Sequence, residues 1–93
     1  MKISKDKKQL QVLRGKLDSI TEKLLALVRK RSSIVAKIGK IKKRNKIPIL
    51  DRERERQVVH EARERALKYG LDPGFAEILI KKLMFYAKKQ QKK

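Results

Sequence analysis

The residues able to do chemistry in this sequence are cations, carboxylates and amides rather than nucleophiles. The chain contains no cysteine and a single histidine, His60. Thiolate metal ligands are therefore excluded, and we expect no metal site. A serine or cysteine nucleophile paired with a base cannot be assembled, and the sequence shows no glycine-rich phosphate loop. If this chain is an enzyme, its chemistry should depend on positioned charges.

Arg31 is the most informative charged residue because it interrupts an apolar pattern. The members of the pattern alternate at spacings of three and four, which predicts a long helix. They are Leu10, Leu13, Leu17, Ile20, Leu24, Leu27, Ile34, Ile38 and Ile41. Position 31 should also be apolar, so Arg31 either extends its charge to water or lies inside a bundle and binds an anion. Lys42 follows on nearly the same face, about 16 Å along the helix, and the two could share a ligand.

A second group of charged residues, Asp51, Arg54 and Glu55, opens the next predicted helix. Alternating arginine and glutamate early in a helix usually forms a solvated, self-paired surface. The alternative is that this turn lines a polar site. Near the end of the chain, Ala87 and Gln91 share a stripe that would carry the amide to the space between helices. Taken alone, Gln91 is typical of a frayed surface residue.

Three helices are expected to position these residues. The first should run over residues 6–44, the second over 52–68, and the third from 73 to about 91. Their end signals are Asp51 and Asp72 as N-caps and Gly70 as the stop of the second helix. Four glycines, two prolines and four aromatic residues leave little for hairpins or a sheet core. The predicted fold class is all-α, with one long helix and two shorter ones.

Length and charge indicate the partners. A chain of 93 residues cannot cover a helix of about 57 Å, so the apolar stripe should pair with a second copy. The net charge of +18 favours an anionic partner, and the lysines over residues 88–93 are expected to be solvated. No run reaches the roughly 18 apolar residues of a membrane span. We expect one cytoplasmic domain over residues 1–93, whose basic segment 1–9 is free to fray, without membrane association.

Six segments form a recognisable pattern when they are taken together. They are Leu13-Arg14-Gly15-Lys16-Leu17-Asp18, Glu22-Lys23-Leu24-Leu25-Ala26-Leu27, Arg31, Gly39-Lys40-Ile41-Lys42, Ile47-Pro48 and Asp51-Arg52-Glu53-Arg54-Glu55. This pattern resembles the AroQ-class chorismate mutases, small all-helical enzymes of aromatic amino-acid biosynthesis. The resemblance covers about residues 10–91.

The resemblance implies an intertwined homodimer of three-helix chains, with two identical sites spanned by the long first helices. It also implies an isomerase that rearranges chorismate to prephenate in the shikimate pathway. The reaction is an intramolecular Claisen-type rearrangement without a cofactor or covalent intermediate. On this resemblance, Arg31, Lys42 and Arg54 would bind the dianionic substrate, and Arg14 would be supplied by the partner subunit.

The resemblance assigns further roles to the remaining residues. Asp51 and Glu55 match the positions that receive the ring hydroxyl, Asp51 through its backbone. Lys42 and Gln91 match the pair that hydrogen-bonds the ether oxygen as its bond to carbon breaks, with Gln90 as the alternative amide. Ala87 departs from the family, since many members carry there a small hydroxyl residue that assists a substrate carboxylate.

The helix geometry agrees with the assignment of Arg14 to the partner subunit. Arg14 precedes Arg31 by 17 residues, which is about 25 Å along a continuous helix. The two arginines therefore cannot contact one small ligand within one chain. An antiparallel partner helix could deliver Arg14.

Three alternative functions remain open at this point. An isochorismate pyruvate lyase can share the fold, although the pattern of Asp51, Arg54 and Glu55 favours the mutase. A basic helical dimer could bind nucleic acid, but the basic residues form no single stripe and no aromatic stacking platform is present. A purely structural coiled coil would be weakened by Arg31 in its seam.

Overall fold

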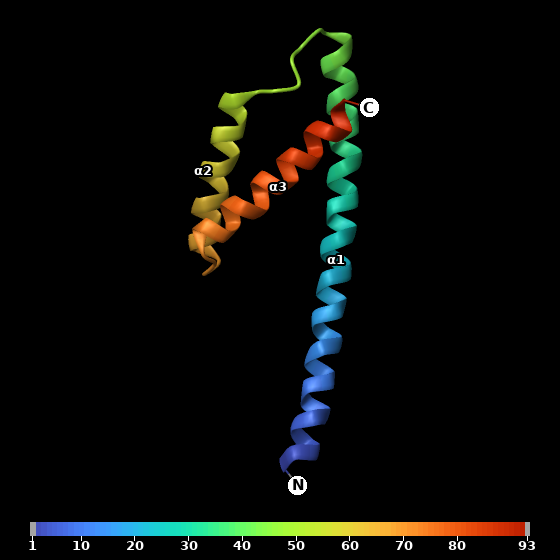
Figure 1. Cartoon of the computed structure of the whole chain (residues 1–93), viewed down its shortest axis with the longest axis vertical. Helices are drawn as coiled ribbons and strands as arrows, with labels where there is room; N and C mark the ends of the chain where they lie inside the picture. The colour runs from blue at the N-terminus through green and yellow to red at the C-terminus, as the bar shows by residue number, and fades with distance from the viewer. Residues whose placement is uncertain (1, 93) are drawn as a thin grey trace. The chain divides into compact units, whose positions relative to one another are not determined.

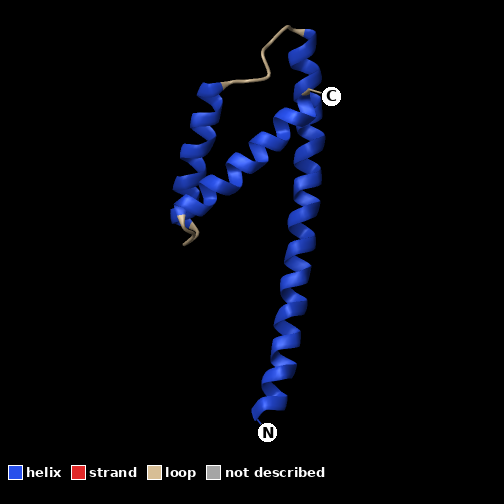
Figure 2. Cartoon of the chain, in the orientation of Figure 1, coloured by secondary structure: helices blue, strands red, loops and turns tan. Residues whose placement is uncertain are grey.

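The computed structural model describes residues 2–92, with side chains from residue 3 onward, and consists of three helices (Figures 1 and 2). Helix α1 spans Lys2–Arg44, α2 spans Arg52–Lys68 and α3 spans Pro73–Gln91. No strand occurs among the described residues, so the all-α class with one long and two shorter helices is confirmed. Residues 1 and 93 of the expected domain lie outside this range. Helix α1 begins four residues before the expected start and includes most of the basic N-terminal segment.

The chain divides into two compact units, Met1–Ser33 and Ile34–Lys93. The first unit is the N-terminal part of α1, and none of its described side chains is buried. The second unit contains the rest of α1 together with α2 and α3. Within it, α2 and α3 contact each other and meet at the turn that joins them, as Figure 1 shows. Most of the predicted site residues belong to this second unit.

Side-chain hydrogen bonds determine where α2 and α3 begin. Asp51 has an extended backbone, and its Oδ1 accepts a hydrogen bond from the Arg54 amide at 3.0 Å. Asp72 likewise accepts from the Gly74 amide at 3.0 Å. Gly70 follows α2 with a φ of 71°, a left-handed conformation that glycine adopts without steric cost. Both predicted N-caps and the predicted stop are confirmed.

An Asp72→Ala variant should lose about 1 kcal/mol of unfolding free energy, because the first turn of α3 loses an acceptor for its unpaired amides. Urea denaturation followed by circular dichroism at a fixed protein concentration measures the change. Asp72→Asn keeps a side-chain acceptor and should stay within a few tenths of a kcal/mol of the parent. Equal urea midpoints for the alanine and asparagine variants would show that the cap does not stabilise the fold.

One small residue is buried on each of α2 and α3, and charged side chains connect the two helices. Ala66 of α2 and Ala87 of α3 are 2% and 7% exposed. On the surface, Arg63 Nη1 of α2 lies 3.0 Å from Glu77 Oε1 of α3, and Lys81 Nζ lies 2.8 Å from Glu77 Oε2. Hydrogen bonds from Lys81 and then Arg63 lower the pKa of the Glu77 carboxyl below its ordinary value. These contacts fix the two helices that carry half of the predicted site.

Most large apolar side chains stay exposed in the single chain. Among the described residues, the buried hydrophobic side chains are those of Val35, Ala66 and Ala87. The apolar stripe predicted for α1 is 41–61% exposed at every one of its positions. On α3, the side chains of Phe75, Ile78, Leu79 and Tyr86 are 41–60% exposed, whereas Met84 is half-buried and Ala87 is buried. No described helix is long and apolar enough to cross a membrane.

Candidate active site

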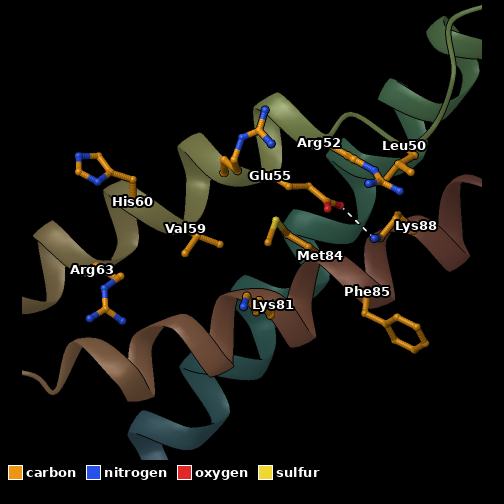
Figure 3. Close-up of a pocket in the computed structure, with 11 residues that line it drawn as sticks. Leu50, Arg52, Glu55, Val59, His60, Arg63, Lys81, Met84, Phe85 and Lys88 are labelled. Carbon is orange, nitrogen blue, oxygen red and sulfur yellow. Dashed lines mark ion pairs between the residues drawn. The ribbon is translucent and has the colours of Figure 1, made fainter.

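A groove of about 920 Å³ is lined by residues of α2 and α3 (Figure 3). Its cations are Arg52, Arg56, Arg63, Lys81 and Lys88, and its apolar residues include Val59, Met84 and Phe85. Positive charge beside an apolar floor suits a small organic anion. Among the predicted site residues, Glu55 lines this groove. No group of three or more potential metal ligands occurs among the described residues.

Glu55 is joined to α3 by an ion pair with Lys88. The Lys88 Nζ lies 3.0 Å from Glu55 Oε2, and the two side chains are 33% and 30% exposed. Figure 3 shows them reaching toward each other from α3 and α2. The expectation that Lys88 belongs to a solvated lysine tail is therefore wrong. Its spacing of four from Met84 and three from Gln91 is the signal that places it on the packed side of α3.

Lys42 is held by the segment that connects α1 to α2. Its Nζ donates a hydrogen bond to the Ile49 carbonyl oxygen at 3.0 Å, and its side chain is half-buried. The connecting segment turns back at Lys46, which has a φ of 56°, and the Ile47 amide donates to the Lys42 carbonyl at 2.8 Å. An ammonium group has three donors, so two remain for a ligand.

Gly39 lets the end of α3 come very close to α1. A Cβ built on the buried Gly39 would lie 3.2 Å from both Cα and Cγ of Gln91, well inside ordinary contact distance. Gln91 is half-buried, and its Oε1 is buried and accepts no hydrogen bond from the described residues. The expectation that Gln91, taken alone, is a frayed surface residue is therefore wrong. This amide oxygen can therefore accept a hydrogen bond from a ligand.

Two contacts connect the end of α3 to α1 and to α2, each about one helical turn or less from a predicted site residue. Lys42 lies three residues after Gly39, which touches Gln91. Lys88 lies three residues before Gln91 and contacts Glu55. Residues three apart are neighbours on a helix, so the last two turns of α3, which carry Gln91, lie near the turn of α1 that carries Lys42 and contact α2 at Glu55.

Asp51 and Arg54 make local contacts at the start of α2. Asp51 uses its carboxylate as the N-cap of α2, and its carbonyl oxygen accepts a hydrogen bond from the Glu55 amide at 3.0 Å. Arg54 is exposed and donates to Gln57 Oε1 at 2.9 Å. Ala87 is buried in the second unit. In the first unit, Arg14 is exposed and Arg31 is half-buried.

Comparison with known proteins relates the chain to one protein family. The profile of the family described as chorismate mutase type II matches residues 13–92. A protein named chorismate mutase from Methanocaldococcus jannaschii is 30% identical over 84 residues, which cover 90% of this chain and 85% of that protein. A protein named 4-amino-4-deoxychorismate mutase from Streptomyces pristinaespiralis is 36% identical over 70 residues, covering 75% of this chain and 54% of that protein.

A longer relative shares the same region. The T-protein of Enterobacter agglomerans is 34% identical over 76 residues, which cover 82% of this chain. The chain spans about 20% of the length of that T-protein. The family profile and the M. jannaschii protein both match most of the chain, and the sequence pattern predicts the same relationship. The chain belongs to the chorismate mutase type II family.

Proposed function

We propose that this chain rearranges chorismate to prephenate, acting as a homodimer. The observation that carries the proposal is the close approach of Gln91 to Gly39, one helical turn from Lys42. This approach supports a site in which an amide and an ammonium act on the same substrate atom. Family membership supports the substrate, and neither the lyase nor the nucleic-acid alternative gains support from the relatives described above.

The proposed reaction asks two things of the protein. One is a compact substrate conformer whose reacting ends are in contact, and the other is stabilisation of the negative charge that grows on the ether oxygen. Arg31 and Arg54 would bind the carboxylates and Glu55 would accept the ring hydroxyl, which restricts the substrate to that conformer. Lys42 and Gln91 would donate hydrogen bonds to the ether oxygen as the carbon–oxygen bond breaks and the new carbon–carbon bond forms.

The proposed dimer follows from the exposed stripe on α1. In the first unit, Leu10, Leu17 and Leu27 are 45%, 61% and 60% exposed, although their spacing is that of a helix-pairing seam. Three buried hydrophobic side chains among the described residues are too few for a stable core of this size. An antiparallel second copy would cover the stripe and bring its Arg14 to the site of the first copy. We further propose that residues 1–93 act as one domain in this dimer.

The first test is the consumption of chorismate by the purified protein, followed by its absorbance, with the product identified by chromatography. The parent should form prephenate. Arg31→Ala should lower kcat/KM on the order of a hundredfold, because it removes a charged donor to a substrate carboxylate. Lys30→Ala removes one charge at the neighbouring, exposed position and should remain close to the parent. A helical parent that leaves chorismate unchanged would falsify the proposal.

A Gly39→Ala variant tests the observation on which the proposal rests. The added methyl group would push Gln91 away by a few tenths of an ångström. We expect kcat to fall about tenfold, since small errors in the position of a transition-state donor are costly. The control is Gly15→Ala in the same helix, where a Cβ meets nothing within 4 Å. It should keep kcat and raise stability by about 0.5–1 kcal/mol. Equal kcat values for the two variants would contradict the assignment of Gln91.

A further inference from the structure

We propose that Lys88 makes the site selective for a substrate that carries a ring hydroxyl over the counterpart that carries an amine at the same carbon. This inference rests on the proposed function, because it assigns to Glu55 the ring substituent of the substrate. Lys88 would act through Glu55 and is a specificity-determining residue rather than a catalytic one. The resemblance described in the sequence analysis assigns no role to Lys88.

The first observation is the geometry of the ion pair. Lys88 and Glu55 lie on different helices, and the Nζ to Oε2 distance is 3.0 Å. Both side chains are about one-third exposed, so this pair is better shielded from water than the Arg56–Glu53 pair of α2, whose side chains are 72% and 83% exposed. The pair therefore holds the Glu55 carboxylate in one orientation and compensates its charge. Figure 3 shows it at the end of the groove that Leu50 and Arg52 also line.

The second observation is that other groove cations already have carboxylates of their own. Arg56 Nη2 lies 2.6 Å from Glu53 Oε2, and Arg63 is paired with Glu77. Among the cations of the groove, Lys88 is thus the one paired with a predicted site residue, Glu55. Arg52 also lines the groove, and its positive charge would oppose the binding of an ammonium group in the same way as that of Lys88.

The chemistry of the pair separates a hydroxyl from an amine. An ionised carboxylate has about four acceptor positions, so Lys88 on Oε2 leaves Oε1 able to accept a hydrogen bond from a neutral hydroxyl. An alkyl amine is an ammonium at neutral pH and would bring a second positive charge beside Lys88. The ion pair has no net charge to compensate the ammonium of the substrate, and repulsion from Lys88 opposes binding of the amino substrate. Without Lys88, the bare Glu55 carboxylate would attract the ammonium instead.

The experiment compares chorismate with 4-amino-4-deoxychorismate as substrates of the full chain. The parent should prefer chorismate. In Lys88→Met, kcat/KM for chorismate should fall several-fold and kcat/KM for the amino substrate should rise, which shifts their ratio at least about tenfold toward the amine. Lys88→Arg keeps the charge and should restore the preference of the parent. Lys82→Met removes an exposed lysine from the same helix and should leave the ratio unchanged.

A double-mutant comparison separates this role from a structural one. In a Glu55→Gln background the carboxylate is gone, so adding Lys88→Met should not change the substrate ratio further. An unchanged ratio in Lys88→Met, or the same shift with and without Glu55, would overturn the inference while leaving the mutase proposal intact. A parent that converts neither substrate refutes the proposed function, and the inference falls with it.

Discussion

Lys42→Met should lower kcat by two to three orders of magnitude while leaving the helical content unchanged. A pre-oriented donor to an oxygen that gains charge in the transition state is typically worth about 3–4 kcal/mol. The methionine side chain has a similar length but cannot donate a hydrogen bond. Because the lost interaction strengthens in the transition state, we expect the loss to fall mainly on kcat rather than KM. Steady-state kinetics with chorismate measures both parameters.

The control for Lys42→Met is Lys43→Met, which removes the adjacent, exposed lysine of α1. It changes the net charge by the same amount and should keep kcat within about twofold, as an exposed charge away from the site does. Lys42 also donates to the Ile49 carbonyl, so the urea midpoint of each variant should be measured. Equal losses of kcat in the two variants would show that Lys42 has no special contact with the ether oxygen.

Mixing two inactive variants, Arg14→Ala and Arg31→Ala, should restore about a quarter of the parental activity. In a mixed dimer, one site combines the intact Arg31 of one chain with the intact Arg14 of the other, and the second site lacks both. Random pairing makes half of the dimers mixed, and each of these has one working site of two. Unfolding the variants together in urea and refolding them before the assay allows the chains to exchange.

Each variant refolded by itself serves as the control for the mixture and should be nearly inactive. A double variant, Arg14→Ala with Arg31→Ala in one chain, mixed with the parent gives a second check. Its mixed dimers should have one defective arginine in each site and no working site. Activity that does not recover in the first mixture would exclude a site shared between chains and assign both arginines to separate roles.

Local signals explain why the helix boundaries were predictable. Asp51, Asp72 and Gly70 act through hydrogen bonds or backbone angles within a few residues, so their positions in the sequence define the ends of α2 and α3. The 3,4 periodicity of α1 is equally local. Helix α1 begins earlier than the apolar pattern predicts, because lysine has good helix propensity and the lysine-rich segment continues the helix without apolar residues.

Contacts between helices explain what the sequence could not specify. The pairing of Lys88 with Glu55 depends on how α3 crosses α2, and no spacing within one helix determines a crossing. The family resemblance indicates Gln91 as a site residue. Its close approach to Gly39 is a contact between α3 and α1, which the spacing of residues within either helix does not determine. The roles of Arg14, Arg31 and Arg54 depend on a partner chain and a substrate, and they stay predictions.

Because few hydrophobic side chains are buried in the single chain, folding of the proposed dimeric enzyme should depend on protein concentration. When Val35, Ala66 and Ala87 are the buried hydrophobic side chains of the described residues, separated protomers have little to hold them folded. Dilution should then unfold the chain rather than release intact monomers, and its melting temperature should rise with protein concentration. The amount of protein that a cell makes would accordingly set both the number of active sites and the fraction of chains that are folded.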